Sequence, residues 1–149
     1  MCGIVGYIGK AQAVPVLVSG LEKLEYRGYD SAGISIFENG KIETIKTKGR
    51  LADLEKKIAG EGEKLSHIGI GHTRWATHGV PSHINSHPHN SQNGKISVVH
   101  NGIIENYLEI KEQLTRQGVT FASDTDTEVV AQLLEFHYQE CGSVLEAVG

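Results

Sequence analysis

Cys2 is the first residue of this sequence with the chemistry of a nucleophile. A small residue after the initiator Met1 is typical of chains from which the methionine is removed, and removal would leave a thiol and a free α-amine on one residue. A thiol with a pKa of ~8.5 needs a base, and an α-amine with a pKa of ~7.7–8.0 has a suitable strength near neutral pH. The position therefore predicts a nucleophile with its base already attached. The alternative is a small buried residue that starts a strand.

Arg74, a second candidate, lies beside the only tryptophan, Trp75, in a polar segment between Gly71 and Gly79. An arginine can bind a carboxylate through two parallel hydrogen bonds, and flanking glycines suit a loop that closes over a ligand. The alternative is a solvated surface charge.

Two further segments place polar groups at the ends of predicted elements. Asn101 and Gly102 follow a predicted strand, where a side-chain amide and a backbone N–H could stabilise an oxyanion. The alternative for an Asn-Gly pair is a plain turn. Asp126 lies in the segment 123–128 at the start of a predicted helix, where acids usually cap the helix and complement its dipole. Its carboxylate could instead bind a substrate ammonium group.

Six of the eight histidines fall between His72 and His100, and only a proline separates His87 from His89. None of these six lies on a predicted helix with the spacing of a zinc motif, and the sequence from 66 to 104 contains no Asp or Glu. We therefore expect hydrogen-bonding histidines, no metal and no cofactor.

Hydrophobic periodicity predicts the elements that must position these groups. Apolar alternation predicts strands over 2–8, 34–37, 41–46, 68–72, 95–99 and 119–121. Helical spacing predicts helices over 12–25, 51–58, 107–117 and 126–140, and the polar segment 73–94 is expected to be a long loop. Asn39 and Gly40, between two predicted strands, indicate a hairpin. Thr125 and Glu128 predict a capping box at the start of the last long helix.

Length and composition limit the class of protein. A chain of 149 residues suits one domain, and 39% hydrophobic with 21% charged residues is typical of a globular protein. No apolar stretch approaches the ~20 residues that span a membrane, and the N-terminus lacks the pattern of a signal peptide. The formal charge of −4 argues against nucleic-acid and anionic-lipid partners. The two cysteines are expected to be reduced thiols in the cytoplasm.

The end of the chain carries a second expected capping box, formed by Ser143 and Glu146. It opens a helix only a few residues before Gly149. We therefore expect the chain to be truncated at its C-terminus. Such a chain would either associate through exposed apolar sheet surface, as an oligomer or an aggregate, or bind partner chains that cover this surface.

Taken together, six segments resemble the glutamine amidotransferases with an N-terminal cysteine nucleophile, in particular the glutaminase domains of the isomerising glucosamine-6-phosphate synthases. The segments follow the order of that family and are 2–6 (CGIVG), 24–33 (LEYRGYDSAG), 72–79 (HTRWATHG), 85–89 (NSHPH), 99–106 (VHNGIIEN) and 123–128 (SDTDTE). The resemblance covers the chain from residue 2 to about residue 135.

The resemblance implies an α+β fold, an αββα sandwich of the N-terminal-nucleophile hydrolase type. Residues 1–149 would be the N-terminal part of a glutaminase domain, and the sugar isomerase domains, which would bind fructose 6-phosphate in the full-length parent, would be absent. Cys2 would attack the glutamine carboxamide while its α-amine relays the proton, and Asn101 with Gly102 would stabilise the oxyanion.

The same resemblance implies a binding site for glutamine around these groups. Arg74 would bind the substrate carboxylate and Asp126 the substrate ammonium group. The surrounding pocket and closing loop would consist of Trp75, Thr77, His78 and His87.

Two alternatives to this hypothesis stay open. The amidophosphoribosyltransferases share the N-terminal cysteine, the His-Asn-Gly and the Asp-Thr-Glu segments, although 26–33, 75–78 and 101–106 are more similar to the hexosamine enzymes. The other alternative is a glutamine-binding fragment without turnover, because the chain is shorter than the glutaminase domain of the family.

Overall fold

The computed structural model describes residues 2–27, 29–75 and 80–149, and its first layer of strands is an antiparallel sheet. The strands are β1 (Gly3–Ile8), β2 (Ser31–Glu38), β3 (Lys41–Lys48) and β4 (Ile68–Arg74), and their order across the sheet is β1-β4-β2-β3. Asn39 and Gly40 join β2 to β3 with φ angles of 52° and 76°, as the expected type I′ turn requires. Gly3 pairs with Thr73, so the nucleophile candidate Cys2 lies beside the end of β4.

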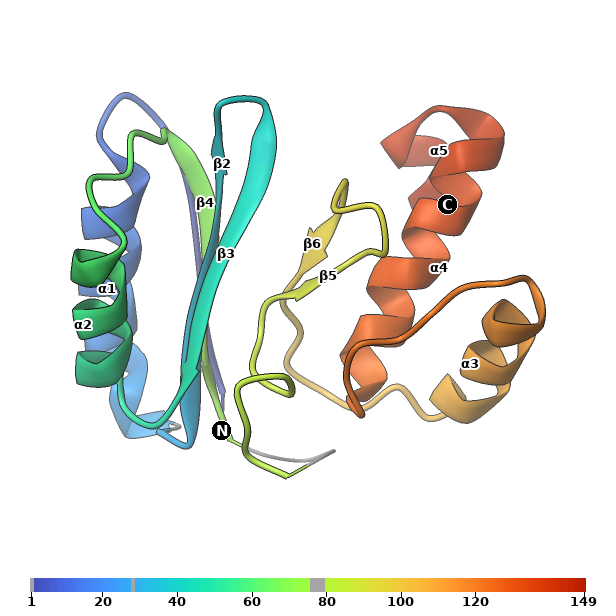
Figure 1. Cartoon of the computed structure of the whole chain (residues 1–149), viewed down its shortest axis with the longest axis horizontal. Coiled ribbons are helices and arrows are strands. Elements are labelled where there is room, and N and C mark those ends of the chain that lie inside the picture. Colours follow the sequence, from blue (N-terminus) through green and yellow to red (C-terminus); the bar gives the residue numbers. More distant parts are fainter. Residues whose placement is uncertain (1, 28, 76–79) are drawn as a thin grey trace.

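Two helices cover one face of this sheet (Figure 1). They are α1 (Ala13–Leu24), which continues into the 3₁₀ turn η1 (Glu25–Arg27), and α2 (Leu51–Gly60). The buried apolar side chains of this face form one cluster, made of Ala13, Leu17, Leu21, Ala32, Ile34, Ile36, Ile45, Leu51 and Leu54. Burial of a Leu or Ile side chain contributes about 1.5–3 kcal/mol relative to exposure. The main apolar core of the described residues therefore lies between this sheet face and the two helices.

A second layer lies on the opposite face of the sheet (Figure 1). The two short strands β5 (His89–Asn90) and β6 (Ser97–Val98) pair antiparallel. The helices of this layer are α4 (Asp126–Cys141), which contacts both strands, and α3 (Tyr107–Arg116) and α5 (Val144–Val148), which contact α4. The expected α+β sandwich with αββα layers is confirmed. Within the part of the chain that the structure describes, no helix has the length and apolar character to cross a membrane.

Polar side chains fill the contact between the two sheets. Ser97 Oγ donates to Ser35 Oγ at 2.8 Å, and Asn90 Nδ2 donates to Thr44 Oγ1 at 2.9 Å. Successive strand residues face opposite sides, so Ile34 packs toward the helices while its neighbour Ser35 faces the second sheet. Because hydrogen bonds are directional, these pairs fix the position of one sheet relative to the other.

Gly33 on β2 permits the close approach of the segment that precedes β5. A Cβ at Gly33 would lie 2.1 Å from the backbone oxygen of His87 and 2.8 Å from Cβ of Lys46. The Lys46 ammonium group donates to three backbone oxygens at 3.3, 2.9 and 3.2 Å, those of Ile84, Ser86 and Pro88. The absence of a side chain at Gly33 therefore allows the segment 84–88 to approach the first sheet, and the hydrogen bonds of Lys46 hold it there.

The long predicted elements are confirmed with small shifts at their ends. The confirmed strands are those predicted at 2–8, 34–37, 41–46 and 68–72, and the confirmed helices are those predicted at 12–25, 51–58, 107–117 and 126–140. The strand predicted at 95–99 is shorter, because only Ser97 and Val98 pair with β5. The loop predicted at 73–94 is wrong at His89 and Asn90, which form β5; a strand of two residues is too short for an alternating pattern.

The strand predicted at 119–121 is wrong. The Val119 N–H donates to the backbone oxygen of Leu114 at 3.0 Å, and the Thr120 N–H donates to Gln92 Oε1 at 2.8 Å. The backbone donors of this segment are thus satisfied by a helix end and a side chain instead of a neighbouring strand.

The capping box predicted at the start of α4 is also wrong in detail. Thr125 is the N-cap residue, but its side chain makes no capping hydrogen bond. Glu128 reaches beyond it and accepts from the backbone N–H of Ala122 at 2.7 Å and of Ser123 at 2.6 Å. At the start of α5, Ser143 Oγ accepts from the Glu146 N–H at 3.4 Å. This bond confirms the Ser143 half of the second predicted capping box.

We expect Gly33→Ala to lower the free energy of unfolding by about 1–3 kcal/mol, because the new methyl group must displace the His87 backbone. Gly6→Ala is the matched control, since Gly6 also lies in a strand of this sheet and a Cβ there meets no atom within 4 Å. Urea denaturation of both variants measures the difference. Equal stabilities of the two variants would contradict the close approach at Gly33.

Candidate functional site

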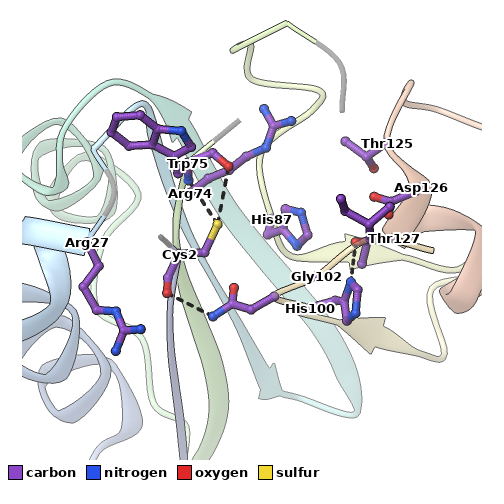
Figure 2. A pocket seen from close by; sticks show the side chains of 12 residues that line it. Cys2, Arg27, Arg74, Trp75, His87, His100, Gly102, Thr125, Asp126 and Thr127 are labelled. Carbon is purple, nitrogen blue, oxygen red and sulfur yellow. Dashed lines mark hydrogen bonds between the residues drawn. The ribbon is translucent and has the colours of Figure 1, made fainter. Parts of the chain in front are cut away.

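A cavity of about 550 Å³ opens between the end of the first sheet and the start of α4. Its lining residues are Cys2, Arg27, Arg74, Trp75, His87, His100, Asn101, Gly102, Ile103, Thr125, Asp126 and Thr127. Figure 2 shows Cys2 on one side of this pocket and Thr125, Asp126 and Thr127 on the other, with His87 between them. Residues from the whole length of the chain therefore meet in one place.

The structure brings together seven of the nine residues predicted for the site. These are Cys2, Arg74, Trp75, His87, Asn101, Gly102 and Asp126. The other two, Thr77 and His78, lie outside the described residues. Sequence reasoning placed none of the remaining lining residues in the site, although Arg27, His100, Thr125 and Thr127 belong to the segments that carried the resemblance.

The Cys2 thiol is held by the backbone of Trp75 at the end of β4. The Trp75 N–H donates to Cys2 Sγ at 3.1 Å, and the thiol lies 3.5 Å from the Trp75 carbonyl oxygen (Figure 2). The indole ring is half exposed and meets Tyr29 edge to face, with 6.0 Å between ring centroids. The backbone N–H fixes the position of the sulfur in the cavity, and a positioned thiol suits a nucleophile.

The side-chain amide of Asn101 connects His72 of β4 with Cys2, the residue that directly precedes β1. Its Nδ2 donates to the backbone oxygen of Cys2 at 3.0 Å, and its Oδ1 lies 2.9 Å from Nε2 of His72. Gly102 follows with a φ of +151°, and a Cβ there would lie 2.9 Å from Nε2 of His100. Glycine is therefore required at this position, directly after Asn101 in the chain.

Arg74 and Asp126 bring opposite charges into the same cavity. Both side chains are almost fully buried, with 2% and 3% of their surfaces exposed. Burial lowers the pKa of the Arg74 guanidinium, while the negative charges of Asp30 and Asp126 oppose that shift. Asp126 Oδ2 also accepts from the Ile104 N–H at 2.7 Å. One cation and one anion in a single pocket can hold the two ends of a free amino acid.

Three histidines form a buried group beneath the cavity. The ring of His87 stacks on that of His72 with 4.2 Å between centroids, and it meets His89 edge to face at 4.6 Å. His89 Nε2 lies 2.9 Å from Thr125 Oγ1. Burial lowers the pKa of all three imidazoles, and the pKa of His72 falls to about 4. The three rings are therefore neutral at pH 7.

Lys46 lies close enough to this group for its charge to act on His87 and His89. Burial lowers the pKa of its ammonium group to about 8, and the negative charge of Glu128 opposes that shift. Among the described residues, no group of three or more His, Cys, Asp or Glu is arranged to hold a metal ion.

The chain matches the family described as the glutamine amidotransferase domain over residues 60–147. Among curated proteins, it is 62% identical to the isomerising glutamine–fructose-6-phosphate aminotransferase of Clostridium tetani and 55% identical to that of Aquifex aeolicus. Each alignment covers 99% of this chain and 24% of the relative. The chain therefore spans about a quarter of the length of these relatives.

Two solved structures with similar folds cover most of this chain. Glutamine phosphoribosylpyrophosphate amidotransferase from B. subtilis matches with a TM-score of 0.73 at 28% identity, over 91% of this chain and 29% of its own. The second is described as the allosteric regulatory enzyme of purine biosynthesis. It matches with a TM-score of 0.76 at 30% identity, over 91% of this chain and 29% of its own.

We expect the free energy of unfolding to decrease as the pH falls from about 6.5 toward 4. An unfolded histidine binds a proton near pH 6.5, whereas folded His72 binds one only near pH 4, so the unfolded chain holds more protons in this window. Above pH 6.5 the contribution of neutral His72 to the free energy of unfolding is fully present. The lowered pKa of His72 corresponds to a loss of about 3 kcal/mol of that free energy at the acid end of the window. His87 and His89 act with the same sign.

Urea denaturation between pH 8 and pH 4.5 measures this dependence. His72→Gln has no imidazole at that position, so its stability should fall less steeply than that of the wild type. His137→Gln, at an exposed position on α4, is the control and should keep the wild-type slope. An identical slope in His72→Gln and the wild type would assign the pH dependence to other groups.

Proposed function

Because the chain belongs to the glutamine amidotransferase family, we propose that it hydrolyses glutamine to glutamate and ammonia with Cys2 as the nucleophile. The observation that carries this proposal is the convergence of Cys2, Asn101 and Gly102 with Arg74 and Asp126 on one cavity. A thiol, two N–H donors and a pair of opposite charges are the groups that amide hydrolysis of an amino acid requires.

The proposed reaction begins with removal of Met1, which gives Cys2 a free α-amine. The amine accepts the thiol proton while sulfur attacks the carboxamide carbon and the carbonyl oxygen becomes an oxyanion. Collapse of this tetrahedral intermediate expels ammonia, which takes up the proton, and leaves a thioester. Water then attacks the thioester carbon, and glutamate leaves as the thiol is restored.

Asn101 and Gly102 are the proposed oxyanion donors. One N–H of the Asn101 amide is bonded to the Cys2 backbone oxygen, which leaves the second N–H for substrate. The Gly102 N–H is the adjacent donor, and its φ of +151° sets the direction of this peptide.

Arg74 and Asp126 are proposed to orient glutamine through its α-carboxylate and α-ammonium groups. Each is buried, so a charged substrate group would be desolvated against its partner, where charge-assisted hydrogen bonds are strong. Trp75, His87, Thr77 and His78 are proposed to complete the pocket, as the family resemblance implies.

We also propose that the ammonia serves the amination of fructose 6-phosphate in a longer parent protein. Support comes from the relatives at 55–62% identity, which carry that activity in their names, whereas the two similar solved structures are 28% and 30% identical to this chain. A chain that binds glutamine without turnover is the alternative that the following experiments exclude or establish.

Cys2→Ala should abolish glutamine hydrolysis while glutamine binding, measured by calorimetry, stays within about threefold of the wild type, because the charged contacts remain. Cys141→Ala is the matched control, since this cysteine is exposed at the end of α4. Equal losses of activity in both variants would contradict Cys2 as the nucleophile. Full activity in a preparation whose intact mass includes Met1 would contradict the role of the α-amine.

Asn101→Ala should lower kcat by about 10²- to 10³-fold with little change in KM, because an oxyanion donor acts mainly in the transition state. Steady-state hydrolysis assays at saturating and limiting glutamine separate the two constants. A rise in KM that accounts for the whole loss would remove Asn101 from the oxyanion hole and assign it to ground-state binding.

A further inference from the structure

His72 is fully buried in β4 and stands directly behind Asn101. The described residues that line the cavity include Asn101 but not His72, so its imidazole has no direct access to a substrate. Its Nε2 lies 2.9 Å from Oδ1 of Asn101, and its ring stacks on that of His87, which also lines the cavity. The contact with Asn101 therefore connects His72 to a candidate catalytic group.

The amide of an asparagine can take two orientations, which differ by exchange of oxygen and nitrogen. The Cys2 backbone oxygen accepts hydrogen bonds only, so Nδ2 of Asn101 must face it, as it does at 3.0 Å. Oδ1 then faces Nε2 of His72, and this nitrogen must carry a hydrogen. The two contacts select the same orientation of the amide and one form of the imidazole.

The opposite orientation of this amide has the wrong chemistry for an oxyanion. Oδ1 would face the carbonyl oxygen of Cys2, and its lone pairs would lie where the proposed reaction develops negative charge. The rotation would also leave the Nε2–H of His72 buried against an NH2 group, and an unsatisfied buried donor is costly. The Nε2–H of His72 therefore destabilises the inactive orientation of the Asn101 amide.

Packing alone does not hold Asn101 in place. The residue is exposed, and it lies in the irregular segment between β6 and α3. His72, in contrast, is held by the ladders of β4 with two neighbouring strands and by its stack on His87, whose ring plane is inclined by only 14°. A rigid buried donor thus controls an exposed side chain.

We infer that His72 is a positioning residue: its Nε2–H fixes the side-chain amide of Asn101 in the orientation that directs N–H groups toward the oxyanion. This inference rests on the proposed function, in which Asn101 stabilises that oxyanion. Burial supports it, because the lowered pKa of His72 keeps the imidazole neutral and leaves it a single N–H.

Two substitutions separate the hydrogen bond from the ring. His72→Phe keeps a ring that can stack on His87 and removes the donor, whereas His72→Gln offers an amide N–H near the position of Nε2. We expect kcat for glutamine hydrolysis to fall about 10- to 100-fold in His72→Phe, with KM within about threefold, and to recover in part in His72→Gln. Should the Phe variant fail to fold, His72→Leu tests the same bond.

A double-mutant cycle with Asn101→Ala identifies the route of the effect. If His72 acts through Asn101, the double variant His72→Phe/Asn101→Ala loses no more than about twofold in kcat beyond Asn101→Ala alone. Independent, multiplying losses would overturn the inference. Leu54→Ala, a core substitution on α2, which covers the other face of the sheet, controls for destabilisation and should keep kcat near the wild-type value while the protein stays folded.

A readout that needs no turnover is the pair of side-chain amide signals of Asn101 in a ¹H–¹⁵N spectrum, assigned by their loss in Asn101→Ala. We expect these signals to shift in His72→Phe and to return toward the wild-type position in His72→Gln. Unchanged signals and unchanged kcat in His72→Phe would overturn the role of His72. If Asn101→Ala itself keeps full kcat, the proposed oxyanion hole fails, and that result is distinct from the failure of His72 alone.

Discussion

The hydrogen bonds of one side chain, Asn101, join the two layers of this protein at its cavity. The residue belongs to the segment after β6, while its partner His72 belongs to the first sheet and its partner Cys2 directly precedes β1 of that sheet. These contacts extend over 99 and 29 residues of sequence. A displacement of about 1 Å between the layers would break them, and errors of that size remove large factors of rate from enzymes. The rest of the fold must therefore keep the two layers in register.

The two faces of the first sheet meet this requirement in different ways. The face under α1 and α2 is apolar and supplies stability that depends little on exact geometry. The opposite face carries Ser35 and Thr44, and it meets the second sheet through directional hydrogen bonds. Lys46 adds three bonds to the backbone that precedes β5. Such a polar contact is stable only when its members are satisfied, and for that reason it specifies one arrangement.

The acidic start of α4 extends this network into the second layer. Asp126 accepts from the Ile104 N–H and also lines the cavity, so it fixes the approach to α3 while it offers charge to a ligand. Glu128 binds the backbone of the preceding turn instead of capping its own helix. Both carboxylates lie where the helix dipole favours negative charge, which lowers the cost of burying them.

The sequence by itself determined the elements whose signals are local. The apolar spacing of Leu17 and Leu21, the alternation through Ile34 and the Asn39-Gly40 turn each depend on neighbours within a few residues, and the structure contains the helix, the strand and the hairpin that they predict. Residue chemistry and family resemblance also indicated seven of the twelve residues that line the cavity.

Only the tertiary structure decided which distant residues meet. Nothing in the spacing of His72 and Asn101 indicates a hydrogen bond, because that contact depends on the order β1-β4-β2-β3 and on the position of a second sheet with strands of two residues. The strand predicted at 119–121 was wrong for the same reason. A strand needs a neighbouring strand to accept its hydrogen bonds, and here the Gln92 side chain accepts from the Thr120 N–H instead. Local pattern sets the faces of each element, whereas directional contacts between layers set the site.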